Sequence, residues 1–310
     1  MKARFPSSRK AYRYDGSYPG FLCCVFESFL HKETPPAILQ EEDPCTFYGE
    51  KWIETDEEHA GRVLRSLPRR ISPDAAAFAR DVFLTNLPEK ELPLLRVLQE
   101  GFCSGGTVLN RLADDDLHLL GKAVRAMRNE AHLLLGFVRF SDYGGTLVSV
   151  ITPKNYVLPI LASHFRSRMP RESFLIYDRT HREGVLYRPG RLLFLPMESF
   201  TPPPPDQTEA EYRALWRRFY HTVAIESREN LKCRASHMPK RYWGNMTEFQ
   251  EEETPSPPAA RRNLLDKKPG SAYDGSTAAV NKQAVLFPGK EKETWQQYPT
   301  RQAGAAGIRV

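Results

Sequence analysis

The segment DDDLHLLGKAVRAMRNEAHLLLGFVRF, residues 114–140, gives the clearest structural signal in this 310-residue chain. It opens with three aspartates, whose negative charge favours the N-terminus of a helix, and its pattern predicts a helix to about Leu135, just before Gly136. At about 100° per residue, one side of that helix collects apolar side chains: Leu119, Ala123, Val124, Ala126, Met127, Ala131 and Leu134. The other side collects basic side chains: His118, Lys122, Arg125, Arg128 and His132. The sequence therefore predicts a helix with one core face and one basic face.

Glu130 interrupts this division, because the helical wheel places it among the apolar positions. An unpaired carboxylate is costly to bury. We therefore expect Glu130 to have a partner within the fold.

Upstream of this helix, the chain opens with a strand, a turn and a helix. The strand is predicted over 12–14 and the turn over 15–17, and the apolar residues that follow recur at the spacing of a helix with one buried face. The polar segment 34–48 contains two adjacent prolines and is predicted as a loop.

Three more helices are predicted before the central one, over 55–67, 72–84 and 89–102. Thr55 and Ser72 are the expected N-caps, and Pro73 occupies a first helical position, where its missing N–H is tolerated. The middle of the chain is therefore expected to be helical.

Downstream, the pattern changes to short apolar runs that are typical of strands. A hairpin is predicted over 137–140 and 146–151, and three further strands over 174–177, 185–187 and 192–195. One helix is predicted from Pro153 to about Arg168. A second, amphipathic helix is predicted over the run that starts at Tyr212 and ends near Arg228. The fold class expected is α+β, with a helical middle section packed with a small, mainly antiparallel sheet.

The domain boundaries follow from composition. Residues 1–11 are expected to be a flexible N-terminus, residues 12–250 a single α+β domain, and residues 251–310 a disordered basic tail. The stretch 255–310 holds nine Lys/Arg and four Asp/Glu, and so carries five of the six net positive charges. The overall positive charge therefore does not by itself indicate nucleic-acid binding.

The composition also indicates where in the cell the protein is expected. No apolar run approaches the roughly 20 residues that span a bilayer, and no secretory signal is predicted. The five cysteines form no CxxC pair, so we expect neither a disulfide framework nor a metal site. A cytoplasmic protein without a cofactor and without membrane contact is the expectation.

Local clusters of cations with aromatic residues predict a nucleic-acid surface, because cations on a rigid face neutralise successive phosphates and aromatic rings stack on bases. The stretch 160–191 adds seven Arg against three Asp/Glu to the basic helix face. The residues expected to contact nucleic acid are Lys122, Arg125, Arg128, Arg139, Arg166, Arg168, Lys240, Arg241, Tyr242 and Trp243. The alternative is a solvated helix face, with residues 238–243 acting as a C-terminal clamp whose rings pack on the domain.

Acid–base chemistry is the other possibility that the residues allow. His132 and His164 form a candidate pair, with Glu130, Asp178 and Asp142 as available carboxylates. No Ser-His-Asp order, HExxH motif or phosphate loop accompanies them, so the interpretation favours a protein without catalytic activity.

Several separated motifs resemble a bacterial family described as a probable DNA metabolism protein, itself a domain of unknown function. The resemblance covers about Tyr12 to Phe249. The residues that carry it are Tyr14-Asp15-Gly16-Ser17 with Gly20-Phe21, Arg128-Asn129-Glu130-Ala131-His132 with Gly136-Phe137-Val138-Arg139-Phe140, Asn155-Tyr156-Val157-Leu158-Pro159 with His164-Phe165, and Met238-Pro239-Lys240-Arg241-Tyr242-Trp243 with Thr247-Glu248-Phe249.

This resemblance implies a partnership with a neighbouring radical-SAM iron–sulfur protein that modifies or repairs DNA. The chain lacks the CxxxCxxC motif that holds such a cluster, so that chemistry would belong to the partner. We therefore expect an accessory, DNA-binding protein of DNA repair or modification. The alternatives are a metal-independent nucleic-acid hydrolase or lyase and a pure protein-interaction scaffold.

Overall fold

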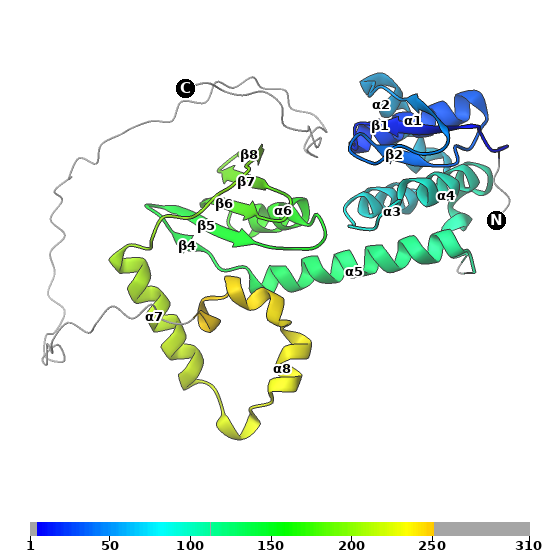
Figure 1. Ribbon diagram of the computed structural model, residues 1–310. Helices are drawn as coiled ribbons and strands as arrows, with labels where there is room; N and C mark the ends of the chain where they lie inside the picture. Colours follow the sequence, from blue (N-terminus) through cyan, green and yellow to red (C-terminus); the bar gives the residue numbers. More distant parts are fainter. Residues whose placement is uncertain (1–4, 112, 251–310) are drawn as a thin grey trace, which may run out of the picture.

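The computed structural model describes residues 5–111 and 113–250, and Figure 1 shows two lobes joined by one long helix. The N-terminal lobe (residues 5–110) contains a three-stranded parallel sheet of order β2-β1-β3. Its elements are β1 (Lys10–Tyr14), α1 (Tyr18–His31), β2 (Ile38–Gln40), β3 (Gly49–Trp52), α2 (Glu57–Arg70), α3 (Pro73–Phe83), α4 (Glu91–Ser104) and the 3₁₀ turn η1 (Gly105–Asn110). The predicted opening strand and helix are confirmed, whereas the predicted loop over 34–48 contains the strand β2.

The turn between β1 and α1 is held by side chains of the first motif. Asp15 Oδ1 accepts hydrogen bonds from the Ser17 backbone N–H (2.9 Å) and hydroxyl (2.7 Å), and Ser17 Oγ in turn accepts one from the Gly20 N–H, which caps α1. A Cβ at Gly20 would clash with Asp15 Oδ1, so a larger residue there would require the Asp15 side chain to shift.

The segment before β1 is attached to this lobe. Ser7 pairs with Thr34 in a parallel bridge, and the Ser8 N–H donates to the Thr34 carbonyl at 2.8 Å. The Pro6 carbonyl also accepts a hydrogen bond from the Thr34 N–H. Part of the stretch 1–11, which is expected to be flexible, is therefore hydrogen-bonded to the lobe.

The predicted helices of this lobe are confirmed, with one correction at a cap. Ser72 caps α3 and Pro73 is its first residue, as expected. Asp56, not Thr55, caps α2, because Asp56 Oδ1 accepts from the His59 N–H at 2.8 Å while the Thr55 hydroxyl donates to Asp15.

The long helix α5 (Asp115–Phe137) crosses the molecule and contributes to two hydrophobic cores. Its first half packs on α4 and the N-terminal lobe through Leu117, Leu120 and Val124, and its second half packs on the C-terminal lobe through Met127. Leu119 is exposed, a departure from the predicted apolar side. The helix passes the expected stop at Gly136.

The C-terminal lobe (residues 141–250) is built on a five-stranded sheet of order β4-β5-β6-β7-β8. Its elements are β4 (Ser141–Asp142), β5 (Thr146–Ile151), α6 (Leu158–Arg168), β6 (Ser173–Asp178), β7 (Glu183–Arg188) and β8 (Arg191–Pro196). The sheet is mainly antiparallel, with β5 and β6 parallel because α6 makes the crossover between them. The strand predicted over 137–140 is wrong: α5 runs through Phe137, and the hairpin partner of β5 is β4.

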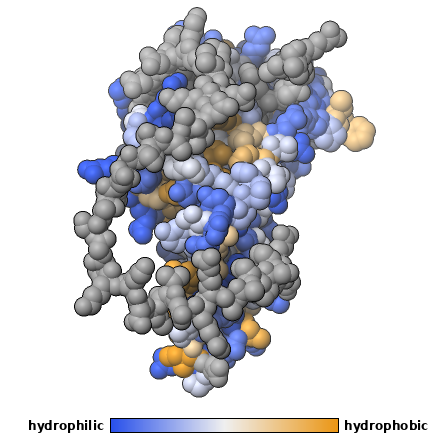
Figure 2. All heavy atoms as spheres, turned by 90° about the vertical axis from the view of Figure 1, so that its left-hand side faces the viewer, coloured by the Kyte–Doolittle hydropathy of each residue, from blue (hydrophilic) through white to orange (hydrophobic). Residues whose placement is uncertain are grey.

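The chain ends its described part with α7 (Gln207–Thr222), α8 (Leu231–His237) and the 3₁₀ turns η2 (Glu226–Arg228), η3 (Lys240–Asn245) and η4 (Thr247–Phe249). The predicted amphipathic helix is present as α7, but it ends at Thr222 rather than near Arg228, which lies in the separate turn η2. Much of its apolar face is exposed, and Figure 2 shows hydrophobic side chains at the lower end of the molecule, where Figure 1 places the end of α7. The exposed apolar residues of α7 are Tyr212, Leu215, Trp216 and Phe219. The predicted disordered tail, 251–310, lies outside the described residues.

The architecture is α+β, as predicted, with two small sheets rather than one. Across residues 5–111 and 113–250, no helix has the length and apolar character needed to cross a bilayer.

Candidate functional site

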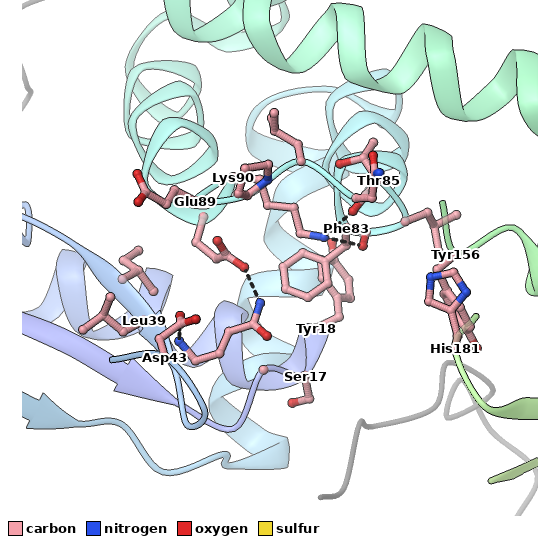
Figure 3. A pocket seen from close by; sticks show the side chains of 18 of the residues that line it. Ser17, Tyr18, Leu39, Asp43, Phe83, Thr85, Glu89, Lys90, Tyr156 and His181 are labelled. Carbon is pink, nitrogen blue, oxygen red and sulfur yellow. Dashed lines mark hydrogen bonds between the residues drawn. The ribbon is translucent and has the colours of Figure 1, made fainter. Parts of the chain in front are cut away.

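A pocket of about 960 Å³ lies between the two lobes (Figure 3). The N-terminal lobe lines it with the start of α1, with β2 and with the α3–α4 connection, and the C-terminal lobe lines it with Tyr156, the β6–β7 turn and the segment after β8. Two hydrogen bonds join the lobes here: the Tyr156 N–H donates to the Leu84 carbonyl (2.9 Å), and the Asn86 N–H donates to the side-chain oxygen Oδ1 of Asn155 (3.0 Å). A pocket of this size suits a small-molecule ligand.

His181 lies on the C-terminal wall and is held by a buried carboxylate. Its Nδ1 lies 2.6 Å from Oδ2 of Asp178, which is fully buried and also accepts backbone N–H bonds from Thr180 and His181. Within the described residues, no hydrogen bond occupies the other ring nitrogen, Nε2. A histidine oriented by a carboxylate at Nδ1 presents Nε2 for proton transfer or hydrogen bonding.

Tyr156 and Glu183 form a second pair next to this histidine. The Tyr156 hydroxyl donates to Glu183 Oε2 at 2.5 Å, and its ring contacts the His181 ring edge-on, with centroids 5.3 Å apart. The pKa of Glu183 is raised to about 7, chiefly by burial; the charge of Asp178 also raises it, whereas the Tyr156 hydrogen bond and His181 lower it. Glu183 therefore changes protonation near neutral pH.

The backbone that carries these side chains includes an unusual conformation. Arg182, between His181 and Glu183, has a φ of +55°, and Glu89 on the facing connection has a φ of +52°. Residues other than glycine rarely adopt left-handed conformations, and such residues cluster at functional sites. Both positions line the pocket.

The N-terminal wall presents buried hydrogen-bonding groups. Glu91, 3% exposed, uses Oε1 to accept from the Tyr14 hydroxyl (3.1 Å) and from Gln40 Nε2 (3.0 Å). In the connection beside it, Lys90 Nζ donates to the carbonyls of Phe83 (2.9 Å) and Thr85 (2.7 Å), which shapes the floor seen in Figure 3.

The predicted histidine pair does not assemble. His132 on α5 and His164 on α6 are both exposed, and neither hydrogen-bonds Glu130 or Asp178 in the described structure. Asp142 lies in the β4–β5 turn, where Oδ1 accepts from the Gly145 N–H. Of the candidate carboxylates, Asp178 is the one that holds a pocket-lining histidine, and that histidine is His181.

Glu130 has partners, as expected. It is 2% exposed and accepts hydrogen bonds from the backbone N–H groups of Lys154 (3.0 Å) and Asn155 (2.8 Å) and from Asn155 Nδ2 (2.6 Å). It also forms an ion pair with Arg241, whose Nη2 lies 3.2 Å from Glu130 Oε1. These hydrogen bonds hold the loop before Tyr156 in place. The helix α6 begins after this loop, at Leu158 rather than at the predicted Pro153.

Sequence reasoning missed His181, Tyr156 and Glu183. His181 and Glu183 lie in the stretch 160–191, where the sequence signal is the excess of arginine, and Tyr156 lies in the range predicted as a helix from Pro153. The signal that was available is Asp178 three residues before His181, since an aspartate before a turn readily binds the groups that follow it.

The predicted nucleic-acid residues divide into two groups. Four cations on the adjacent helices α5 and α6 are exposed and take part in no ion pair within residues 5–111 and 113–250: Lys122, Arg125, Arg166 and Arg168. Arg128, also exposed, pairs with Asp81. Arg139 is half-buried, and its guanidinium pairs with both oxygens of Glu248.

The segment 240–243 packs as a clamp. Tyr242 is buried and its ring lies 5.5 Å from that of Phe137, so it does not offer a stacking surface to a base in this conformation. Trp243 is partly buried and stacks on Phe249, and Arg241 pairs with Glu130. Lys240 is exposed over the Trp243 ring. Both rings therefore pack on the domain, as in the clamp interpretation, whereas Arg241 turns inward to Glu130.

Glu248 connects this clamp to α7. It accepts from Arg139 and, at 3.1 Å, from Trp216 Nε1. Burial alone would raise the pKa of Glu248, but the hydrogen bonds from Arg139 and Trp216 outweigh it and hold the pKa below its usual value.

Comparison with known proteins finds one match to a family model, described as "Domain of unknown function (DUF4130)", over residues 88–248. The matched range begins just before α4 and ends in η4, so it contains α5, the whole five-stranded sheet and the clamp. It also contains the cluster around His181. No curated protein and no solved structure matches the chain.

Proposed function

The chain belongs to the DUF4130 family, whose description assigns no function, and we propose that it binds DNA as an accessory protein of DNA repair or modification. The observation that supports this proposal is the set of four exposed, unpaired cations on α5 and α6: Lys122, Arg125, Arg166 and Arg168. Cations without ion-pair partners are free to exchange their counterions for phosphate. Phosphate contacts of this kind position a duplex without reading its sequence.

The test is the salt dependence of binding by the full chain. The affinity for a fluorescently labelled duplex is measured by anisotropy between low and physiological salt, for the wild type and for Lys122→Ala/Arg125→Ala. Removing two phosphate contacts should reduce the slope of log K against log salt by about two.

The control removes the same charge elsewhere. Arg69 and Arg70 are exposed at the end of α2, in the N-terminal lobe. Arg69→Ala/Arg70→Ala should keep the wild-type slope. Absence of DNA binding, or equal slopes for the two double variants, would contradict the proposal.

A second part of the proposal concerns the partner, the radical-SAM iron–sulfur protein that the family resemblance implies. The exposed apolar row of α7 favours docking of a protein, because a helix with an apolar face normally buries it. Trp216, Leu215 and Phe219 are 40%, 60% and 54% exposed among the described residues.

This part is tested with the purified partner. Leu215→Ser/Phe219→Ser should weaken its binding about tenfold or more, as expected for the loss of two apolar contacts at an interface. Leu30→Ser, at an equally exposed position on α1, is the control and should bind as the wild type does. Unchanged binding by the α7 variant would place the partner elsewhere, and no binding by the wild type would remove this part of the proposal.

A further inference from the structure

Three cations line the pocket and take part in no ion pair within the described residues: Arg80, Lys154 and Arg182. They come from α3, from the loop before α6 and from the β6–β7 turn, so three separate elements bring positive charge to one cavity. Their neighbours in the chain supply Tyr156 and His181. Cations that converge without carboxylate partners are typical of a site for a phosphate group.

The N-terminal wall also offers acceptors. Glu91 Oε1 is already engaged by Tyr14 and Gln40, whereas its Oε2 has no hydrogen bond within the described residues. Asp43 also lines this wall and accepts from the Gln40 N–H at 2.7 Å. A ligand group placed here would be recognised by its N–H donors.

Aromatic rings lie between these walls. Tyr18 and Phe83 contact each other with centroids 5.1 Å apart, and Figure 3 shows both rings in the middle of the pocket, with Tyr156 and His181 to one side and Leu39 to the other. Aromatic faces bind flat heterocycles by stacking, without regard to base identity. The volume of about 960 Å³ is sufficient for a ligand of this kind.

We propose that this pocket binds a single nucleotide, with its phosphate at Arg80, Lys154 and Arg182, its base on the aromatic rings, and N–H donors of the base facing Glu91. His181, held by Asp178, presents Nε2 to the same ligand. The pocket is distinct from the basic surface of α5 and α6.

This inference rests on the proposed DNA role in one respect, the source of the nucleotide. The nucleotide is either free in solution or part of a DNA strand. Binding of mononucleotides does not require the α5 surface. The two proposals are therefore measured with different variants, and the failure of one leaves the other intact.

The experiment titrates the full chain with each of the four deoxynucleoside 5′-monophosphates by calorimetry at pH 7 and low salt. The corresponding nucleosides and inorganic phosphate serve as separate probes. We expect saturable binding of at least one nucleotide, with an affinity about tenfold or more above that of its nucleoside, because the nucleoside lacks the charge-assisted bonds to the cations.

Arg80→Ala/Lys154→Ala should lower nucleotide affinity about tenfold or more, and Arg69→Ala/Arg70→Ala should leave it unchanged. Thermal unfolding of each variant shows whether the fold is kept. If Arg80→Ala/Lys154→Ala is unfolded, the single variant Lys154→Met, which keeps the side-chain stem, replaces it.

Saturation by none of the nucleotides, equal affinity for nucleoside and nucleotide, or wild-type affinity in a folded pocket variant would overturn the inference. A single-stranded oligonucleotide distinguishes the sources. If it displaces the mononucleotide, the bound unit belongs to a strand, and if it does not, the ligand is a free nucleotide.

Discussion

Glu183 provides a sharp test of the pocket geometry, because its carboxyl is buried beside another carboxylate. It is 8% exposed, and the pKa rises from 4.5 to about 7, chiefly through burial. A carboxyl whose pKa is raised in the folded state binds its proton more tightly there than in the unfolded chain. The contribution of Glu183 to stability is therefore fully present below about pH 4.5 and is lost as the pH rises through about 7.

The magnitude follows from the shift. Each pKa unit corresponds to about 1.4 kcal/mol, so the shift of Glu183 amounts to roughly 3 kcal/mol between the acidic and the alkaline limit. Glu183→Gln removes the titrating proton and keeps an oxygen that can accept from the Tyr156 hydroxyl. Relative to the wild type, the variant should therefore gain about 2.5 kcal/mol as the pH is raised from 5 to 8, because pH 5 already lies above the unfolded pKa of 4.5.

The assay is urea unfolding of both proteins at pH 5, 6, 7 and 8, with the m-value used to check that the same surface is exposed in each. The remaining ionisable groups are present in both proteins, so the difference between them reports Glu183 together with its interactions with its charged neighbours. Glu198→Gln, an exposed carboxylate that also lines the pocket, should show no such trend. A difference between wild type and Glu183→Gln that stays flat with pH would refute the reasoning.

Three further substitutions test the rest of the fold by urea unfolding. Glu130→Ala removes the acceptor of two buried backbone N–H groups and should lower the free energy of unfolding by roughly 3–5 kcal/mol, and a loss below about 1 kcal/mol would contradict this role. Arg139→Ala leaves Glu248 buried without its cation and should lower the free energy of unfolding by about 3 kcal/mol at pH 7. The pKa of Glu248 is lowered in the wild type, so its stabilising effect on the fold is present above about pH 4.5. The cost of the substitution should therefore shrink as the pH falls below about 4.5. Gly20→Ala places a Cβ against Asp15 and should cost about 1–3 kcal/mol, whereas unchanged stability would mean that the turn before α1 yields.

The sequence predicted the elements whose signals are local. The charge at Asp114, the capping of α3 by Ser72 and the periodicity of α5 each depend on residues within one or two turns. The need for a partner at Glu130 was also evident, because the helical wheel alone places that carboxylate in the core. These features can be predicted because they depend on helix geometry and on residues that are close together in the sequence.

The N-terminal sheet was not predictable in the same way. Its strand β2 has only three residues, and β1 lies between two strands that follow it along the chain. Pairing of this kind is decided by packing between distant segments, and the local pattern of a three-residue strand is too short to show it. The pocket was hidden for the same reason, since it joins α1, the α3–α4 connection and the β6–β7 turn.

The basic residues show how the information in the sequence differs from that in the tertiary structure. The helical period of α5 by itself determined that Lys122, Arg125 and Arg128 would face outward, because the apolar residues on the other side had to be buried. Only the tertiary structure decided which charges remain free: it brings Asp81 to Arg128 and Glu248 to Arg139. Side-chain period is a property of one helix, whereas the neutralisation of a charge depends on every element that folds against it.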